Sequence, residues 1–197
     1  MNSKIKLFGM IILTSMISAC GKHNKIEVDP EFQPYYQRFL SNASSVSIDL
    51  STQDITIRFV PNISGANPNY VTLGVCFFAD NLVEINQLYW GKLSTPRKEA
   101  LISHELGHCL LERRHDDALD PVSKKMLSVM NTYLVGAVDF SNKYDYYIKE
   151  LFLAPQTKDL VAFNSVNSTY VSPIPASTLK PSELDSIKLM EEQEAHN

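Results

Sequence analysis

The sequence predicts an α+β fold, in which a small mixed, twisted sheet is followed by one long helix and a small helical C-terminal half. Apolar and polar residues alternate over short stretches of the first half, which is the period of strands with one buried face. Two later stretches carry helical patterns, one after Pro96 and one near residue 150. The 197 residues are 44% apolar and 20% charged, as expected of one globular domain.

The first twenty residues predict export and lipidation. Lys4 and Lys6 precede an apolar stretch from Leu7 to Ile17 that is too short for a permanent membrane span, so residues 1–19 are typical of a signal peptide. The last four residues of this segment, ending in Cys20, resemble the lipobox of bacterial lipoproteins. An ordinary cleaved signal is the alternative. Because Gly21 and not Asp follows Cys20, the resemblance implies an outer-membrane lipoprotein anchored by acyl chains.

The charge balance argues against nucleic acid as a partner. Lys and Arg number 18 against 22 Asp and Glu, which gives a net charge of −4, whereas nucleic-acid binders are normally basic. We therefore expect no nucleic-acid partner. The protein is expected to be a monomer, and its membrane contact is the lipid at Cys20. After a tether over 20–28, the folded domain is expected over 29–154 and a polar, loosely packed tail over 155–197.

The elements of the domain follow from local patterns. Asp29-Pro30 precedes helically spaced aromatic residues and predicts a helix through Leu40, whose start Pro34 can delay. Four strands are expected, over 46–50, 55–59, 71–78 and 82–88, with a loop at 61–69.

The second half is expected to be mainly helical. Thr95 is the expected N-cap and Pro96 the first residue of a helix that extends to about Arg113. Residues 118–142 look irregular, and a last amphipathic helix carries Tyr144 to Phe152.

The stretch HELGHCLLERRH at 104–115 carries the strongest chemical pattern. Its first five residues form the motif H-E-x-x-H. On a helix, His104 and His108 lie on one face, so both can bind one Zn²⁺, while Glu105 beside them can take the proton of a zinc-bound water. Zn²⁺ is therefore the expected cofactor and Glu105 the expected general base.

The third metal ligand is expected to be His115. In an unbroken helix His115 would lie about 10 Å beyond His108, too far for a shared ion. The helix must therefore end near Glu112 and the chain must fold back through the two arginines that follow. Carboxylates remain the alternative ligands, namely Asp116, Asp117, Asp120 and Glu150.

Cys76 and Cys109 are the cysteines that remain if Cys20 is lipidated. An exported protein reaches an oxidising compartment, where a disulfide is allowed, and a free buried pair is the alternative. Cys109 lies about 100° around the helix from His108, so it is not expected to bind the metal.

With these residues, the chain resembles the zincin metallopeptidases and, among them, the metzincins. Metzincins continue the motif as H-E-x-x-H-x-x-G-x-x-H and later carry a Met-turn, for which SVMN at 128–131 offers Met130. The resemblance covers about residues 29–153 and extends to short bacterial lipoproteins described as metallopeptidases. It implies a zincin-like fold. Tyr133, beside Thr132, is the candidate for the extra ligand or oxyanion donor of some metzincins.

Two features depart from the metzincin pattern. The third histidine comes one residue late, and Leu111 stands where the turn glycine is expected. The reversal therefore needs another route, such as a wider turn through Glu112, Arg113 and Arg114.

The sequence thus predicts a zinc-dependent endopeptidase anchored to the bacterial envelope. Its substrate is a peptide or protein, which would pair as an extended strand with residues Leu73 to Phe78. Two alternatives remain open. One is a non-catalytic, lipid-anchored binding or structural protein with a structural zinc; the other is a gluzincin-like peptidase with a carboxylate such as Glu150 as third ligand.

Overall fold

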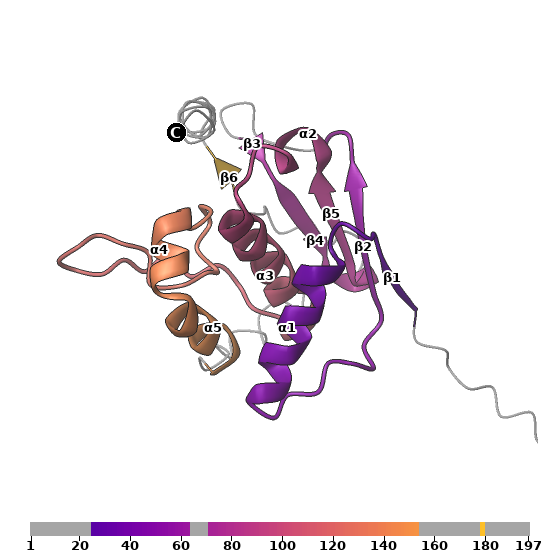
Figure 1. Cartoon of the computed structure of the whole chain (residues 1–197), viewed down its shortest axis with the longest axis horizontal. Helices are drawn as coiled ribbons and strands as arrows, with labels where there is room; N and C mark the ends of the chain where they lie inside the picture. Colours follow the sequence, from indigo (N-terminus) through magenta and orange to yellow (C-terminus); the bar gives the residue numbers. More distant parts are fainter. Residues whose placement is uncertain (1–24, 64–70, 154–177, 180–197) are drawn as a thin grey trace, which may run out of the picture.

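The computed structural model describes residues 25–63, 71–153 and 178–179, which form an α+β structure with one small mixed sheet (Figure 1). The helices and strands are, in chain order, β1 (Ile26–Val28), α1 (Gln33–Ser45), β2 (Ile55–Val60), β3 (Val71–Thr72), β4 (Gly74–Phe77), the 3₁₀ turn η1 (Phe78–Asp80), β5 (Leu82–Asn86), α2 (Gln87–Trp90), α3 (Thr95–Leu111), α4 (Ala137–Asn142), α5 (Tyr144–Leu153) and β6 (Thr178–Leu179). Within the described ranges, no helix is both long and apolar enough to cross a membrane.

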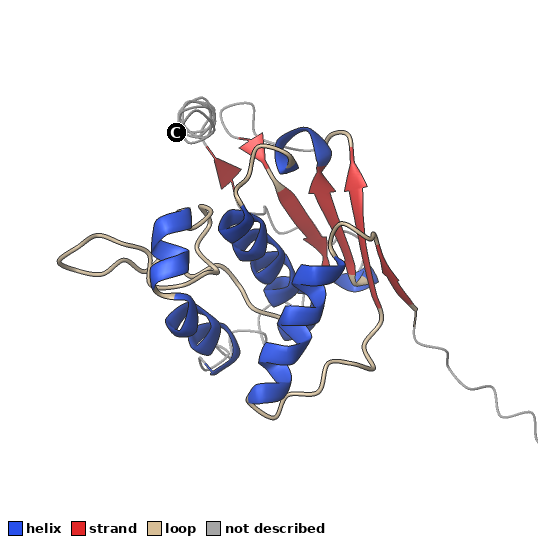
Figure 2. Cartoon of the chain, in the orientation of Figure 1, coloured by secondary structure: helices blue, strands red, loops and turns tan. Residues whose placement is uncertain are grey.

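The main sheet has four strands in the order β1-β2-β5-β4. The first three are parallel, and β4 runs antiparallel to β5 at the edge. Inward-facing residues alternate as a half-buried sheet requires: Ile55 and Ile57 on β2 are buried, as are Val83 and Ile85 on β5. Figure 2 shows that α1 and α3 lie along one side of the sheet and that α4 and α5 lie beyond α3.

The position of α3 between the sheet and the C-terminal helices explains its burial. Every residue from Ala100 to Leu111 is buried, whereas a helix with one solvated face would expose a polar stripe. Its apolar side chains, among them Leu101 and Leu106, join the main core. The polar groups of this helix are therefore held away from water, which costs free energy unless they are partnered or functional.

Two expectations for the N-terminal half were wrong. Residues Ile26–Val28, expected in the tether, form β1 and pair with Ile55–Ile57 of β2. Residues 46–50 form no strand, because the chain turns at the end of α1 with Ser47 in the left-handed region at φ 65°. The backbone N–H of Ile48 donates to the Ala43 carbonyl at 3.0 Å, and the apolar residues of this segment pack in or against the main core instead of pairing as a strand.

The other strand and helix boundaries also shifted. The strand expected over 71–78 divides at Leu73 into β3 and β4. The strand expected over 82–88 ends at Asn86, and α2 begins at the next residue. The long helix has Ser94 at its N-cap in place of the expected Thr95. α4 lies inside the stretch expected to be irregular.

Several expectations lie outside the described residues. They are the signal peptide over 1–19, the lipidation site at Cys20, and the tail over 155–197 apart from β6. β6 pairs antiparallel with β3, with Val71 opposite Leu179.

Candidate metal centre

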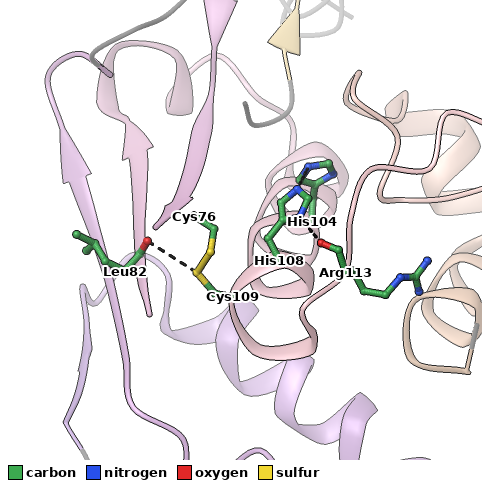
Figure 3. The surroundings of a disulfide bond; sticks show 6 residues. All are labelled: Cys76, Leu82, His104, His108, Cys109 and Arg113. Atoms are coloured by element: carbon green, nitrogen blue, oxygen red, sulfur yellow. Dashed lines mark hydrogen bonds between the residues drawn. A yellow bond between two sulfur atoms is a disulfide. The ribbon is translucent and has the colours of Figure 1, made fainter. Parts of the chain in front are cut away.

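Helix α3 presents His104 and His108 one turn apart and almost wholly buried, with 0% and 1% of their surfaces exposed. The Nε2 atoms of the two rings lie 3.0 Å apart. Figure 3 shows both imidazoles on a side of α3 other than the one that faces the sheet. The spacing of four residues has therefore placed two nitrogen donors at one point.

His115 reaches the same point because the chain reverses after α3. The helix ends at Leu111, and Glu112 takes the left-handed conformation at φ 55°. The backbone N–H of Arg113 then donates to the Gly107 carbonyl six residues back, at 2.9 Å, and this bond closes the helix end. Glu112 thus takes the left-handed conformation that a glycine usually supplies at the end of a helix.

The three histidines form one compact donor set. His115 Nε2 lies 3.3 Å from His104 Nε2, and one ligand nitrogen from each ring lies within 4.8 Å of the others. Three imidazole nitrogens around a common point are a donor set that suits zinc and several other transition metals. The residues present thus fit a metal ion.

Backbone carbonyls fix the orientation of the two helical imidazoles. His104 Nδ1 lies 2.8 Å from the Val129 carbonyl oxygen, and His108 Nδ1 lies 2.5 Å from that of Arg113. A carbonyl oxygen can only accept, so Nδ1 carries the proton and donates in both rings. The unprotonated Nε2 atoms therefore face the shared point, which is the tautomer that a metal ligand needs.

The environment also keeps the three histidines neutral. Burial is the largest cause that lowers each pKa: that of His104 lies well below 6.5, that of His108 is about 4, and that of His115 is also lowered. The neighbouring histidines add to the effect at His104, and Asp117 partly opposes it at His115. At neutral pH all three rings are in the uncharged form that binds a metal.

Glu105 lies beside this cluster, wholly buried, and borders the edge strand of the sheet. A Cβ atom added to Gly74 of β4 would lie 2.9 Å from Oε1 of Glu105. Only a glycine leaves room for the carboxylate there. The carboxylate thus lies between the histidine helix and β4.

The turn that contains Met130 lies directly against α3. Met130 is fully buried, and a Cβ atom added to Gly107 would lie 2.5 Å from its sulfur. The Ser128 hydroxyl accepts from the Met130 N–H at 3.0 Å, and the Met130 carbonyl accepts from the Asp116 N–H at 2.9 Å. The predicted Met-turn residue therefore packs against the middle of the histidine motif, where Gly107 admits it.

The carboxylates considered as alternative ligands have other partners. Asp117 accepts from the N–H and hydroxyl of Thr132, and Glu150 pairs with Arg113 at 2.6 Å. Asp116 and Asp120 accept from backbone N–H groups of their own loops. Within the described part of the chain, the metal-competent cluster contains His115 and none of these acids. Tyr133, the candidate extra ligand or oxyanion donor, is 38% exposed, and its backbone N–H donates to Asn131 Oδ1 at 3.0 Å.

Cys76 of β4 and Cys109 of α3 are joined by a disulfide. Figure 3 shows this bond on the side of α3 toward the sheet, with the histidines on another side. The bond therefore ties the edge strand to the residue next to His108 without entering the donor set.

Comparison with known families decides the class of protein. A family model described as "Putative phage metallopeptidase" matches residues 58–160, just over half of the chain. The chain belongs to this metallopeptidase family. No curated protein and no solved structure matched it.

The part of this metallopeptidase matched by the family model contains every residue of the site. It begins within β2 and includes β4, α3, the turn at Met130 and α5. β1 and α1, which complete the sheet and cover α3, precede the matched segment.

Sequence reasoning missed the groups that support the site. The carbonyls of Val129 and Arg113 carry no sequence pattern, because every residue has a carbonyl. The pairing of Arg113 with Glu150 was also missed, although a buried arginine beside a metal motif needs an acidic partner.

Proposed function

We propose that this metallopeptidase is a zinc-dependent endopeptidase of metzincin type. The observation that carries the proposal is the convergence of three neutral imidazoles, each with an Nε2 atom near a common point, beside a buried glutamate. His104, His108 and His115 would hold the metal ion. When bound, Zn²⁺ supplies Lewis-acid chemistry, because it polarises a carbonyl and makes water more acidic.

Glu105 acts in this proposal as the general base. Its carboxylate takes a proton from the attacking water and passes it to the nitrogen of the leaving amine. The protein environment of Glu105 supports this role, since this residue of α3 is wholly buried and its carboxylate borders β4.

Strand β4 is the proposed docking edge for substrate. It is the last strand in the order β1-β2-β5-β4 and borders Glu105 through Gly74. An extended peptide could add to the segment Leu73–Phe77 by main-chain hydrogen bonds, as peptides do at sheet edges. This mode favours an internal peptide segment, and hence endopeptidase activity.

The metzincin assignment rests on His115 and Met130. His115 approaches the helical pair after a chain reversal, and Met130 packs against Gly107 beneath the motif. The reversal uses one extra residue and a left-handed Glu112 in place of a glycine.

The test compares Glu105→Gln with Glu99→Gln, a control on the same helix whose carboxylate pairs with Arg38. Both variants should bind zinc like the wild type, because neither residue is a proposed ligand. Hydrolysis of a quenched peptide library should be abolished in Glu105→Gln and kept in Glu99→Gln. Full activity in Glu105→Gln would reject the mechanism. Zinc binding without hydrolysis in the wild type would favour a structural metal.

We further propose that the mature protein is anchored to the bacterial envelope, in the outer membrane, through lipid on Cys20. The support is the sequence Ile17-Ser18-Ala19-Cys20 after an apolar segment. Cys20→Ser should block acylation and leave an uncleaved precursor, as judged by fatty-acid labelling and N-terminal mass. A labelled or normally processed Cys20→Ser protein would contradict the anchor.

A further inference from the structure

One carboxylate links the two backbone segments that orient the helical histidines. Glu150 on α5 has 15% of its side chain exposed, and each of its oxygens has a different partner. Oε1 accepts from Arg113 Nη2 at 2.6 Å, and Oε2 accepts from the Ser128 hydroxyl at 2.8 Å. Arg113 follows α3, whereas Ser128 begins the turn of Met130.

Each partner of Glu150 either carries, or is next in sequence to, a carbonyl that accepts from a histidine ring. The Arg113 carbonyl accepts from His108 Nδ1, as described above. Ser128 directly precedes Val129, whose carbonyl accepts from His104 Nδ1. The Ser128 hydroxyl also accepts from the Met130 N–H. The two orienting carbonyls thus belong to segments that share one acidic partner.

The arginine in this cluster is held unusually firmly. Arg113 is 8% exposed, and its Nη1 donates to the carbonyls of Glu150 and Leu151 at 3.0 and 2.8 Å. These carbonyls lie in the last turn of α5, where a cation is favoured by the helix dipole. A buried guanidinium with so many acceptors fixes its own backbone, including the carbonyl used by His108.

We infer that Glu150 is a positioning residue for the metal centre, which it serves by holding the Arg113 and Ser128 segments together. The inference rests on the proposed function, because it concerns the same three histidines. Glu150 binds no metal in this account. It fixes the two carbonyls that set the ring orientation and tautomer of His104 and His108, and groups of this kind commonly tune metal affinity.

Glu99 provides a matched control. It lies in α3, with 14% of its side chain exposed, and it too accepts from an arginine and a hydroxyl, those of Arg38 and Tyr144. Substitution of Glu99 removes the same kinds of bond but leaves the Arg113 and Ser128 segments intact. A general loss of stability would therefore affect both sites, whereas a loss of metal affinity would affect one.

The experiment measures Zn²⁺ affinity of the purified whole chain by competition with a chelator, and the visible spectrum of its Co²⁺ form. Glu150→Ala should weaken Zn²⁺ binding about 10- to 100-fold and change the Co²⁺ spectrum, while Glu99→Ala keeps both. Glu150→Gln should fall between, because its amide oxygen still accepts from Arg113. Wild-type affinity in Glu150→Ala would overturn the inference.

A second variant covers the case in which Glu150→Ala does not fold. Ser128→Ala removes only the hydroxyl bridge between Glu150 and the Met130 N–H, and it should lower Zn²⁺ affinity with an unchanged circular dichroism spectrum. Unchanged affinity in folded Ser128→Ala would overturn the inference. A wild-type chain that binds no Zn²⁺ would reject the proposed function itself, and the two failures are thus distinguishable without a peptidase assay.

Discussion

Glu112 makes the site possible at the scale of a single residue. Its left-handed backbone turns the chain back, so that His115 meets the histidines of α3 instead of continuing past them. L-residues other than glycine adopt this conformation at a cost of about 1–2 kcal/mol. The metal centre therefore carries local strain at a position that does not bind the metal.

Glu112→Gly should raise the free energy of unfolding by about 0.5–1 kcal/mol, because glycine removes this strain but loses more backbone entropy on folding. Glu112 also stands at the C-terminal, negative end of the α3 dipole, where a negative charge is unfavourable, so its removal adds to the gain. Glu112→Val, with a branched Cβ, should be less stable than the wild type. Urea unfolding of the metal-free wild type and the two variants measures the order of their stabilities. A Glu112→Gly variant less stable than the wild type would contradict the proposed backbone strain.

The lowered pKa values of the histidines predict how stability depends on pH. A histidine with a folded-state pKa below its unfolded value near 6.5 takes up protons first in the unfolded chain. Its contribution is therefore complete above pH 6.5 and is lost as the pH falls toward the folded-state pKa. For His108, with a pKa of about 4, the loss amounts to about 3 kcal/mol.

Urea unfolding of the metal-free protein at pH 7.5, 6 and 5 should show a decreasing free energy of unfolding over this range. In His108→Gln the decrease should be smaller, because one of the titrating rings is gone. Stability that is constant or rises from pH 7.5 to 5 would show that the imidazoles are not buried in the neutral form.

At the scale of elements, the disulfide fixes the edge strand to the histidine helix. Cys76 lies in β4, two residues after Gly74, and Cys109 directly follows His108. The bond closes a loop with a sequence separation of 33 residues that contains η1, β5, α2 and most of α3. It thus joins α3, which carries Glu105, to β4, the strand that the Glu105 carboxylate borders.

The double variant Cys76→Ser/Cys109→Ser should lose about 3–4 kcal/mol of unfolding free energy, as estimated from the entropy of closing a loop of this length. Urea unfolding without reductant measures the loss. A matched count of free thiols in the unfolded wild type should give no reactive thiol at these two positions. Two reactive thiols, or a negligible change in stability, would contradict the bond.

Prediction from sequence succeeded for elements whose local pattern and tertiary environment agree. The long helix was predicted because Pro96 suits a first helical turn and the next fifteen residues contain no proline. The parallel strands β2 and β5 were predicted from their alternation. The segment 46–50 alternates in the same way, but the turn after α1 determines its structure.

In the candidate site, too, the sequence predicts what depends on local spacing and not what depends on tertiary contacts. The motif around His104 and His108 depends on helical spacing alone, which sequence reveals. The reversal at Glu112 could be inferred only as a geometric requirement, because no glycine marks it. Glu150 bonds to Ser128, 22 positions away in the sequence, and to Arg113, 37 positions away. Only the packing of α5 reveals these contacts.

At the scale of the whole molecule, the site lies where the two halves of the fold meet. The sheet supplies the border at Gly74, α3 supplies two histidines and Glu105, and the C-terminal half supplies the turn at Met130. Figure 1 shows α3 between the sheet and the helices α4 and α5. A buried helix with two histidines and a glutamate would be costly if it served only stability. The architecture is better explained by a metal ion that these groups hold.

The coordination of bound zinc tests this account most directly. Zinc-edge X-ray absorption of the purified, zinc-loaded protein should show three imidazole nitrogens at about 2.0–2.1 Å and one exchangeable oxygen ligand. His115→Ala should lose one nitrogen. A fourth protein ligand that closes the site, a carboxylate in place of the third imidazole, or a wild-type protein that binds no zinc would contradict the account.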